Sequence, residues 1–307
     1  MIRIDGSEKS GSGTILRYAM ALSSLLGEEL EMTNIRAMRK KPGLRPQHLR
    51  SVIACSEMTG GVVEGAVIDS TRIRYRPGAG SEKTSYVWDI GTAGSTTMLA
   101  YSILPLAIFS PKPLHFKISG GLFQDFAPGP YHMKRVLLAF LATMGVESSL
   151  KIVRPGYVPR GGGVIELETR PTRGKLTACT RNEQGRVRNV RGVSLASHLG
   201  SQKVSSRMAD RCQSVLSRRG LHARFEILDD TSASQRGAAL FVSVETDTGC
   251  FIGADRAGRV GRSSEAIGAF VAKSLLEDLE TGATADRHLA DQLILFAGLA
   301  GGTTTYL

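Results

Sequence analysis

A repeated segment constrains the fold of this chain more than any other feature of its 307 residues. The stretch GSGTILRYAM at 11–20 aligns with GSTTMLAYSI at 94–103, an offset of 83 residues. Glycine, serine, threonine, leucine and tyrosine recur at matching places. A repeat of this period is one supersecondary unit that needs a neighbour to bury its apolar face. We therefore expect at least two similar units on a shared core.

Each copy predicts the same order of elements: helix, strand, helix, strand, strand. After the opening helices, the later elements are expected at 30–35, 46–60, 62–68 and 72–77 in the first unit and at 114–119, 129–145, 148–155 and 163–170 in the second. Two helices on one sheet make a two-layer sandwich, so the fold class is α/β, built from α+β sandwiches. His48 and His132 lie at equivalent places near the starts of the second helices.

The helix pattern returns near the end of the chain, where Leu293 aligns with Met98. These residues are 195 positions apart, so we expect an insert of about 112 residues before the third unit. The insert pattern predicts a strand, a helix, three strands and a helix, at 187–196, 201–220, 222–228, 238–246, 250–257 and 263–280. We predict a repeat domain of residues 1–174 plus 285–307 and an α/β insert domain of residues 175–284.

The third unit is expected to hold one helix, within 291–307, and the first residues of a strand. A half-unit of this kind exposes an unpaired sheet edge and uncovered helix surface, which folded domains avoid. We therefore expect the chain to be a C-terminally incomplete version of a longer protein.

The net charge of +11 favours a polyanionic partner such as nucleic acid. A basic loop surrounds the rigid turn at 41–44 and contains Arg36, Arg39, Lys40, Lys41, Arg45 and Arg50. Its turn indicates a shaped surface, although a solvated charged face is the alternative. A second group of arginines alternates with apolar residues over 72–76, which is typical of the wet face of a strand.

The four cysteines, Cys55, Cys179, Cys212 and Cys250, are far apart and form no zinc or disulfide pattern. They indicate a reducing compartment. The sequence has no run of 18 apolar residues, so we expect no membrane partner. The expected location is the cytoplasm, or the nucleus or nucleolus in a eukaryote.

Several stretches occur together in one order: GTILR, IRAMRKKPGLRPQHL, GTAGS, YVPRGGG, ETDTGC and HLADQL. As an ordered set, they resemble the RNA 3′-terminal phosphate cyclase family. The resemblance implies three repeats of a two-helix, four-stranded unit, with a smaller thioredoxin-like insert domain in the third. It implies conversion of an RNA 3′-phosphate end to a 2′,3′-cyclic phosphate through a histidyl-AMP and an RNA adenylate. ATP with Mg²⁺ or Mn²⁺ is the implied cofactor.

The resemblance also implies site residues. The expected ATP-binding residues are Tyr101, His288, Leu289, Ala290, Asp291 and Gln292, and the expected RNA- or phosphate-binding residues are Arg17, Arg36, Arg39 and Gln47. Guanidinium groups bind phosphate oxygens in pairs, so the second set is chemically sensible. The alternatives are that Asp291 and Gln292 cap a helix that starts after them, and that each arginine forms a surface salt bridge.

Some residues depart from the family pattern. Ser10 and Thr14 replace a glutamate and a glutamine, Tyr101 replaces a glutamine, and His288 replaces a tyrosine. The family's nucleophilic histidine falls at a position beyond Leu307, and none of the six histidines here occupies it. We therefore expect an impaired enzyme, with catalytic and metal-binding residues unassigned.

Two other functions stay open. One is a catalytically inactive, cyclase-like RNA-binding protein acting in RNA processing or ribosome assembly. The other is a small-molecule transferase built on the same repeat, as in enolpyruvyl transferases.

Overall fold

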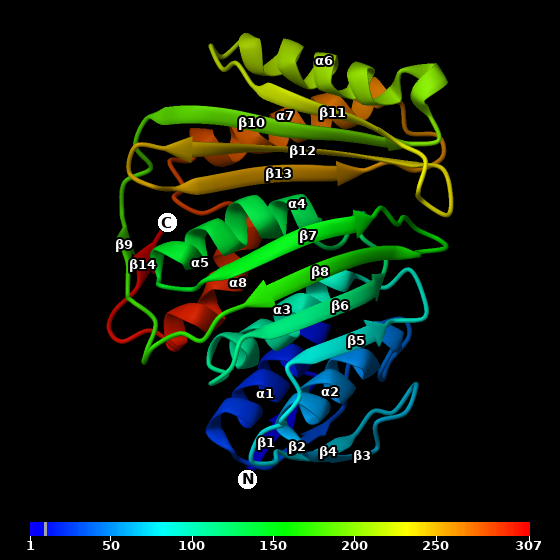
Figure 1. Cartoon of the computed structure of the whole chain (residues 1–307). Helices are drawn as coiled ribbons and strands as arrows, with labels where there is room; N and C mark the ends of the chain where they lie inside the picture. Colours follow the sequence, from blue (N-terminus) through cyan, green and yellow to red (C-terminus); the bar gives the residue numbers. More distant parts are fainter. Residues whose placement is uncertain (9–10) are drawn as a thin grey trace.

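The computed structural model describes residues 1–8 and 11–307 and confirms the α/β fold class. These residues form three four-stranded sheets and one two-stranded sheet. Figure 1 shows the three larger sheets stacked from the first unit at the bottom, through the second, to the insert at the top. Most helices lie between or behind these sheets, and one covers the insert at the top of the view.

The first two units have the same topology, which confirms the repeat. The first contains β1 (Ile2–Asp5), α1 (Gly13–Leu26), β2 (Leu30–Thr33), α2 (Pro46–Thr59), β3 (Val62–Glu64) and β4 (Ile73–Arg76). The second contains β5 (Ser85–Asp89), α3 (Thr96–Ile108), β6 (Leu114–Gly120), α4 (Pro130–His132), η1 (Met133–Leu137), α5 (Leu138–Thr143), β7 (Ser148–Arg154) and β8 (Gly163–Thr169). Their sheets have the equivalent orders β1-β2-β4-β3 and β5-β6-β8-β7.

The opening strand of each unit, β1 or β5, was missing from the predicted pattern. Each pairs in parallel with the next strand of its unit. A further refinement concerns the second helix of the second unit, which is continuous in space but contains the π-helical turn η1. The four-stranded sheets therefore match the architecture that the family resemblance implied.

The arginines of β4 lie on a solvent-facing strand surface, as their alternation predicted. Arg74 and Arg76 both contact Glu29 on the neighbouring chain segment, at 3.3 and 2.5 Å, and Arg72 pairs with Glu31. This surface is largely neutralised by its own carboxylates.

The insert contains every predicted element. These are β10 (Val187–Ser197), η2 (Gly200–Gln202), α6 (Val204–Ser217), β11 (Arg224–Asp230), β12 (Gly237–Thr246), β13 (Phe251–Ala257) and α7 (Ser264–Glu280). Its sheet has the order β11-β10-β12-β13. Alternate residues of β12 face two cores: Leu240 packs with the insert helices, whereas Phe241 belongs to the core of the repeats. The predicted domain boundaries stay a prediction.

The third unit contributes helix α8 (Arg287–Gly298) and strand β14 (Thr305–Tyr306). The helix begins at Arg287, four residues earlier than predicted. Strand β14 pairs in parallel with β9 (Thr180–Arg181), which lies just before the insert sheet. The C-terminal segment is thus packed against the chain that leads into the insert (Figure 1).

Two features bear on the environment of the protein. The four cysteines are buried free thiols, and burial raises the pKa of Cys55 and of Cys212 to about 12. Among the described helices, none combines the length and the apolar character that crossing a bilayer requires.

Four aromatic rings join the insert to the second unit. Phe123 stacks on Tyr157 with ring centroids 5.4 Å apart, and on Tyr131 at 5.9 Å. Tyr131 in turn stacks on Phe241 of β12 at 6.3 Å. Rings at these separations add a geometry-dependent attraction to their buried apolar area. The insert sheet is therefore held to the repeats by a packed interface.

We predict that Phe241→Ala lowers the free energy of unfolding by about 3–5 kcal/mol, because it leaves a cavity in this interface. Urea unfolding measures the change. The matched control is Phe126→Ala, since the Phe126 ring is 98% exposed whereas that of Phe241 is 1% exposed. Equal losses in the two variants would show that the interface is not a closely packed core.

Candidate functional site

Polar side chains from α1, α2, α3 and α8 gather where the repeats meet. The amino end of α1 is close to α2: a Cβ atom built on Gly13 would lie 2.3 Å from Nε2 of His48 and 3.2 Å from Nη1 of Arg17. Glycine at this position therefore lets the imidazole ring approach the helix backbone. The Ser12 hydroxyl caps the helix by accepting a hydrogen bond from the Thr14 amide at 3.3 Å.

Arg17 is a buried cation in this cluster. Its side chain is on α1 and is 4% exposed, and its Nε has no hydrogen-bond partner within residues 1–8 and 11–307. Among the described residues, no carboxylate forms an ion pair with it. Burial, with a smaller contribution from Arg36, lowers the pKa of Arg17 to about 10. The guanidinium thus keeps its charge at neutral pH without an anion from the described part of the chain.

Three tyrosine hydroxyls bind three consecutive carbonyl groups of α8. Tyr306 donates to the Ala290 oxygen at 2.9 Å, and Tyr18 donates to the Asp291 oxygen at 2.7 Å. Tyr101 donates to the Gln292 oxygen at 2.8 Å, and its hydroxyl also lies 3.0 Å from that of Tyr18. Burial raises the pKa of Tyr101 strongly, so the hydroxyl stays protonated. The hydroxyl of Tyr101, a predicted ATP-binding residue, is therefore engaged in joining helices.

The predicted adenylate residues 288–292 lie on different faces of α8. His288 and Asp291 are exposed, and Ala290 is partly buried. Leu289 belongs to the hydrophobic core and is fully buried. Gln292 is 8% exposed, and no described residue forms a hydrogen bond with its Oε1. The backbone carbonyl of Gln292 is bound by Tyr101, and the charge of Arg17 acts on the Tyr101 hydroxyl, so both residues belong to this cluster.

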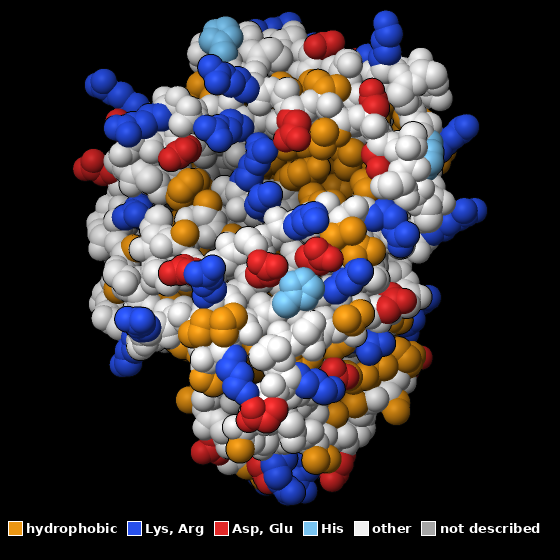
Figure 2. All heavy atoms as spheres, viewed as in Figure 1, with side chains coloured by type: hydrophobic (Ala, Val, Ile, Leu, Met, Phe, Trp, Pro, Cys, Tyr) orange, Lys and Arg blue, Asp and Glu red, His pale blue; other side chains and the backbone are white. Residues whose placement is uncertain are grey.

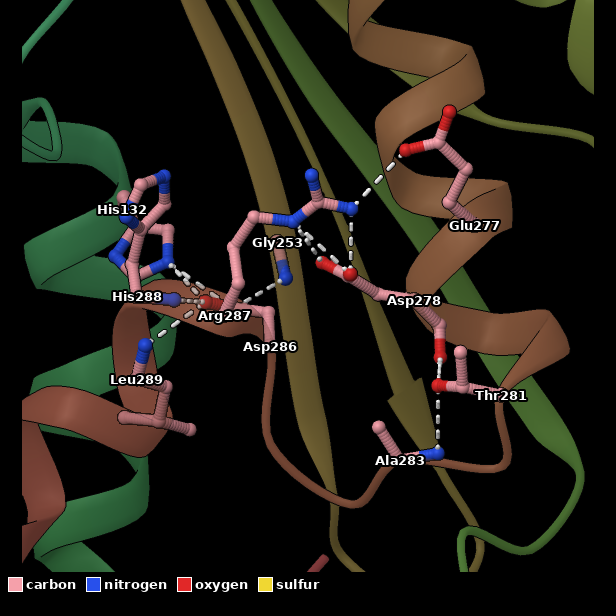
Figure 3. Close-up of polar contacts among 10 residues, drawn as sticks. All are labelled: His132, Gly253, Glu277, Asp278, Thr281, Ala283, Asp286, Arg287, His288 and Leu289. Atoms are coloured by element: carbon pink, nitrogen blue, oxygen red, sulfur yellow. Dashed lines mark hydrogen bonds and ion pairs between the residues drawn. The ribbon is translucent and has the colours of Figure 1, made fainter.

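Asp286 caps α8, so the alternative that Asp291 and Gln292 cap it is wrong. One Asp286 oxygen accepts hydrogen bonds from the amides of His288 and Leu289, both at 2.9 Å. The other accepts from the Gly253 amide of β13 at 2.8 Å, and His132 Nε2 approaches it at 3.0 Å. Figure 3 shows these groups converging from three separate elements. One carboxylate thus fixes α8 to the insert and to the second unit.

His132 carries the charge that balances Asp286. Both side chains are fully buried. Burial opposes protonation of His132, but the Asp286 carboxylate outweighs it and raises the pKa of the imidazole. Burial likewise disfavours the Asp286 carboxylate, yet His132 and the amide donors lower its pKa. The raised pKa of His132 and the lowered pKa of Asp286 both favour a buried ion pair between the two groups.

His48 differs sharply from its repeat equivalent His132. Burial and then the charges of Arg17 and Arg36 lower the pKa of His48 to about 3. Its Nδ1 accepts a hydrogen bond from the Arg45 amide at 3.3 Å, so the neutral ring carries its proton on Nε2. His48 is thus a neutral residue that closes the start of α2.

Gln47 and the basic loop border the same cluster. Oε1 of Gln47 accepts a hydrogen bond from the Ser95 amide, at the start of α3, at 3.0 Å. Nη1 of Arg36 donates to the carbonyls of Lys41 and Gly43, at 2.9 and 2.8 Å. Arg36 is partly buried, whereas Arg39 is exposed. These contacts position Gln47 and Arg36, and the roles of both residues and of Arg39 stay predictions.

The basic loop has a defined shape, as its turn predicted. Gly43 has a φ of +74°, and a Cβ atom built on it would lie 2.2 Å from the Asp69 carbonyl oxygen. The Gly43 amide donates to Ile35 at 2.8 Å, and the Asp69 amide donates to Leu44 at the same distance. The loop is therefore held against the turn that precedes β4.

Thr14 and Ser10 replace residues that contact ATP in the family pattern. Thr14 lies in the first turn of α1. Ser10, which replaces the glutamate of the family pattern, lies outside the described ranges 1–8 and 11–307. Across those ranges, no group of three or more His, Cys, Asp or Glu side chains could bind a metal. The metal-binding residues thus stay unassigned.

Sequence reasoning missed the residues that position α8. Tyr18 lies at the repeat position of Tyr101, and this equivalence could have identified it. Asp286 precedes Leu289 at capping spacing, which is a local signal. Its contacts to His132 and Gly253 join residues more than 30 positions apart, and no sequence pattern indicates them.

Comparison with known proteins gives one consistent family. A family model described as RNA 3′-terminal phosphate cyclase matches residues 8–307. A protein of that name from Pyrobaculum neutrophilum is 36% identical over 98% of this chain and 86% of its own length. Proteins of the same name from Korarchaeum cryptofilum and Archaeoglobus fulgidus are 38% and 37% identical, over 98% and 100% of this chain and 85% and 90% of their own lengths.

We predict that His132→Gln destabilises the protein by about 3–5 kcal/mol near pH 6, because it leaves Asp286 buried without its cation. The raised pKa of His132 stabilises the fold below its unfolded value of about 6.5, and this contribution is lost as pH rises through the folded pKa. The lowered pKa of Asp286 stabilises the fold above about pH 3.9, and this contribution is lost as pH falls through its folded pKa. The deficit of the variant should therefore shrink at high pH.

Thermal unfolding at a series of pH values measures this deficit. His222→Gln is the matched control, because His222 is an exposed residue of the insert. Asp255, Asp278 and His288 also lie near the pair and are unchanged in both variants. A deficit that does not vary with pH would contradict the buried ion pair.

Proposed function

This chain belongs to the RNA 3′-terminal phosphate cyclase family, and we propose that it binds an RNA 3′-phosphate end and ATP around Arg17. The proposal includes the family reaction, ATP-dependent formation of a 2′,3′-cyclic phosphate. It also holds that residues 1–307 are impaired in the first step of that reaction. The observation that carries it is the buried Arg17 guanidinium, which forms no ion pair with any described residue.

A buried guanidinium without a counter-ion is costly in a folded protein. A ligand that supplies the missing anion would offset the free-energy cost of burying Arg17. A terminal phosphate monoester carries up to two negative charges and several acceptor oxygens, and a guanidinium can bind two of them at once. Arg36 lies near enough to affect the pKa of Arg17, and Arg39 affects that of Arg36. The exposure of the side chain decreases from Arg39 through Arg36 to Arg17.

The same location suits the nucleotide. Gln292 offers a buried, unsatisfied Oε1, which can accept a hydrogen bond from an exocyclic amino group. His288 presents an exposed ring at the start of α8, where stacking on a base is possible. These features support placing the adenine against α8 and the phosphates toward Arg17.

The proposed chemistry explains why phosphate-binding cations are needed. A 3′-phosphate oxygen would attack the α-phosphorus of a histidyl-AMP, the phosphorus–nitrogen bond would break, and the histidine would leave, which gives an RNA adenylate. The vicinal 2′-oxygen then attacks the RNA phosphorus, loses its proton, and AMP leaves with the bridging oxygen. Negative charge accumulates around phosphorus in both steps, and fixed cations stabilise it. Arg17 and Arg36 would supply this stabilisation, and a divalent metal would neutralise charge on the phosphates of ATP.

The geometry of three of the six histidines supports the proposed impairment. His48 has its Nδ1 bonded and its Nε2 against Gly13, while His132 is paired with Asp286. His198 Nε2 contacts the Ala233 carbonyl at 2.7 Å in the insert. Attack on ATP requires an accessible, unprotonated ring nitrogen facing the α-phosphorus. These environments do not suit that role.

We predict that Arg17→Met weakens binding of an RNA 3′-phosphate between about tenfold and a hundredfold, through loss of charge-assisted hydrogen bonds. The unfolding free energy should stay the same or rise, because the change removes a buried, unpaired charge. Calorimetric titration and urea unfolding measure the two quantities. The control is Arg218→Met, at an exposed position on the insert. Loss of stability with unchanged binding would assign Arg17 a structural role.

A second test concerns adenylylation. Incubation of the 307-residue chain with ATP labelled at the α-phosphate, and with Mg²⁺ or Mn²⁺, should leave no covalent AMP on the protein. Mass spectrometry of the intact chain detects the adduct. A stable histidyl-AMP would contradict the impairment. If calorimetry also detected no ATP binding but intact RNA binding, the alternative of a cyclase-like RNA-binding protein would be favoured.

A further inference from the structure

We propose that a basic groove between the insert and the second unit binds the RNA chain on the 5′ side of its terminal phosphate. This inference rests on the proposed function, because it extends the same ligand away from Arg17. The groove, called here the insert groove, has a volume of about 750 Å³. It lies between the β7–β8 connection, the loop before β12 and the loop after β13.

All charged side chains that line the insert groove are positive. Its lining contains five arginines and no aspartate or glutamate. Two of the arginines are neutralised by carboxylates outside the lining: Arg207 pairs with Glu265, and Arg262 pairs with Asp125. The other three, Arg160, Arg236 and Arg259, are exposed and form no ion pair with any described residue. Three unpaired cations around one groove suit the phosphates of a nucleic acid strand.

The walls of the groove are held in place by specific contacts. Nη1 and Nη2 of Arg262 each donate to Asp125 at 2.8 Å, which joins the loop after β13 to the second unit. Gln235 bridges the opposite side: its Oε1 accepts from the Arg160 amide at 3.3 Å, and its Nε2 donates to the Val158 carbonyl at 3.0 Å. The groove is therefore formed before a ligand arrives, which limits the entropy lost on binding.

The groove adjoins the chain segment that leads to the Arg17 cluster. Gly161 follows Arg160 directly, and a Cβ atom built on it would lie 2.9 Å from the Thr92 oxygen and 3.0 Å from the Ala93 Cα. The same segment continues to Ser95, whose amide is bound by Gln47 at the cluster. A strand with its 3′ end near Arg17 can thus pass over residues 92–95 into the insert groove.

The groove can also accommodate bases without reading their sequence. Val158 and Val260 line it with side chains that are 55% and 103% exposed. Figure 1 places the connections after β7, before β12 and after β13 at the right-hand edge of the molecule. Figure 2 shows Lys and Arg side chains projecting from that edge. A single strand in this position would have its phosphates near the arginines and its bases against apolar surface.

Other basic or hollow surfaces fit a phosphate chain less well. The larger cavity of about 970 Å³ on the second sheet is lined by Glu147 and Glu168 as well as Arg170. On the first sheet, the arginines of β4 are paired with Glu29 and Glu31. Both surfaces present carboxylates that repel phosphate, whereas the lining of the insert groove has none.

The test compares two triple variants with the same change in net charge. The groove variant is Arg160→Ser, Arg236→Ser and Arg259→Ser, and the control is Arg173→Ser, Arg186→Ser and Arg188→Ser, which are exposed arginines outside the groove. The probes are a fluorescent RNA of about 12 nucleotides and a trinucleotide, both with a 3′-phosphate. Fluorescence anisotropy at several salt concentrations measures binding. Thermal unfolding checks that both variants fold.

For the longer RNA, the groove variant should bind between about tenfold and a hundredfold more weakly than the control, and the slope of log K against log salt should fall by about 2. Its affinity for the trinucleotide should be unchanged. Equal affinities of the two variants for the longer RNA would overturn the groove while leaving the proposed function standing. If the unmodified protein bound neither RNA, the proposed function would fail and the groove with it.

Discussion

The hydroxyl groups of Tyr18 and Tyr101 join helix α8 to the first helices of the two complete repeats. The tyrosines are equivalent in the repeat, lie 3.0 Å apart at their oxygens, and donate to adjacent carbonyls of α8. Phe296, at the corresponding place of the third repeat, packs against Tyr101 with ring centroids 6.0 Å apart. The three repeats therefore meet at one aromatic residue from each. The Arg17 cluster lies beside this junction, so its geometry depends on it.

Two buried charges near the junction are balanced in different ways. Asp286 has His132 and three amide donors, so its charge is compensated by the protein and fixes the start of α8. Arg17 has no such partner among the described residues. A buried charge that has partners within the protein is tolerated in the fold. A buried charge without partners lowers stability until a ligand of opposite sign binds it. This contrast separates the structural part of the site from its functional part.

Local sequence patterns predicted the elements well, and long-range contacts explain what they missed. The alternation in β12 and the helical spacing in α7 depend on neighbouring residues, so the insert was predicted element by element. Strand β1 is only four residues long, too short for its alternation to stand out. Family resemblance predicted a phosphate-binding role for Arg17 and an ATP-binding role for Gln292. It could not show that Arg17 lacks a counter-ion or that the Tyr101 hydroxyl is engaged, because both depend on packing between repeats.

The central claim is that the Arg17 guanidinium binds the terminal phosphate of an RNA. The most direct test is calorimetric titration of the protein with two RNAs of the same sequence, one ending in a 3′-phosphate and one in a 3′-hydroxyl. The account predicts that the 3′-phosphate form binds at least about tenfold more tightly, with the difference coming from charge-assisted hydrogen bonds at Arg17. Equal affinities for the two RNAs would contradict it.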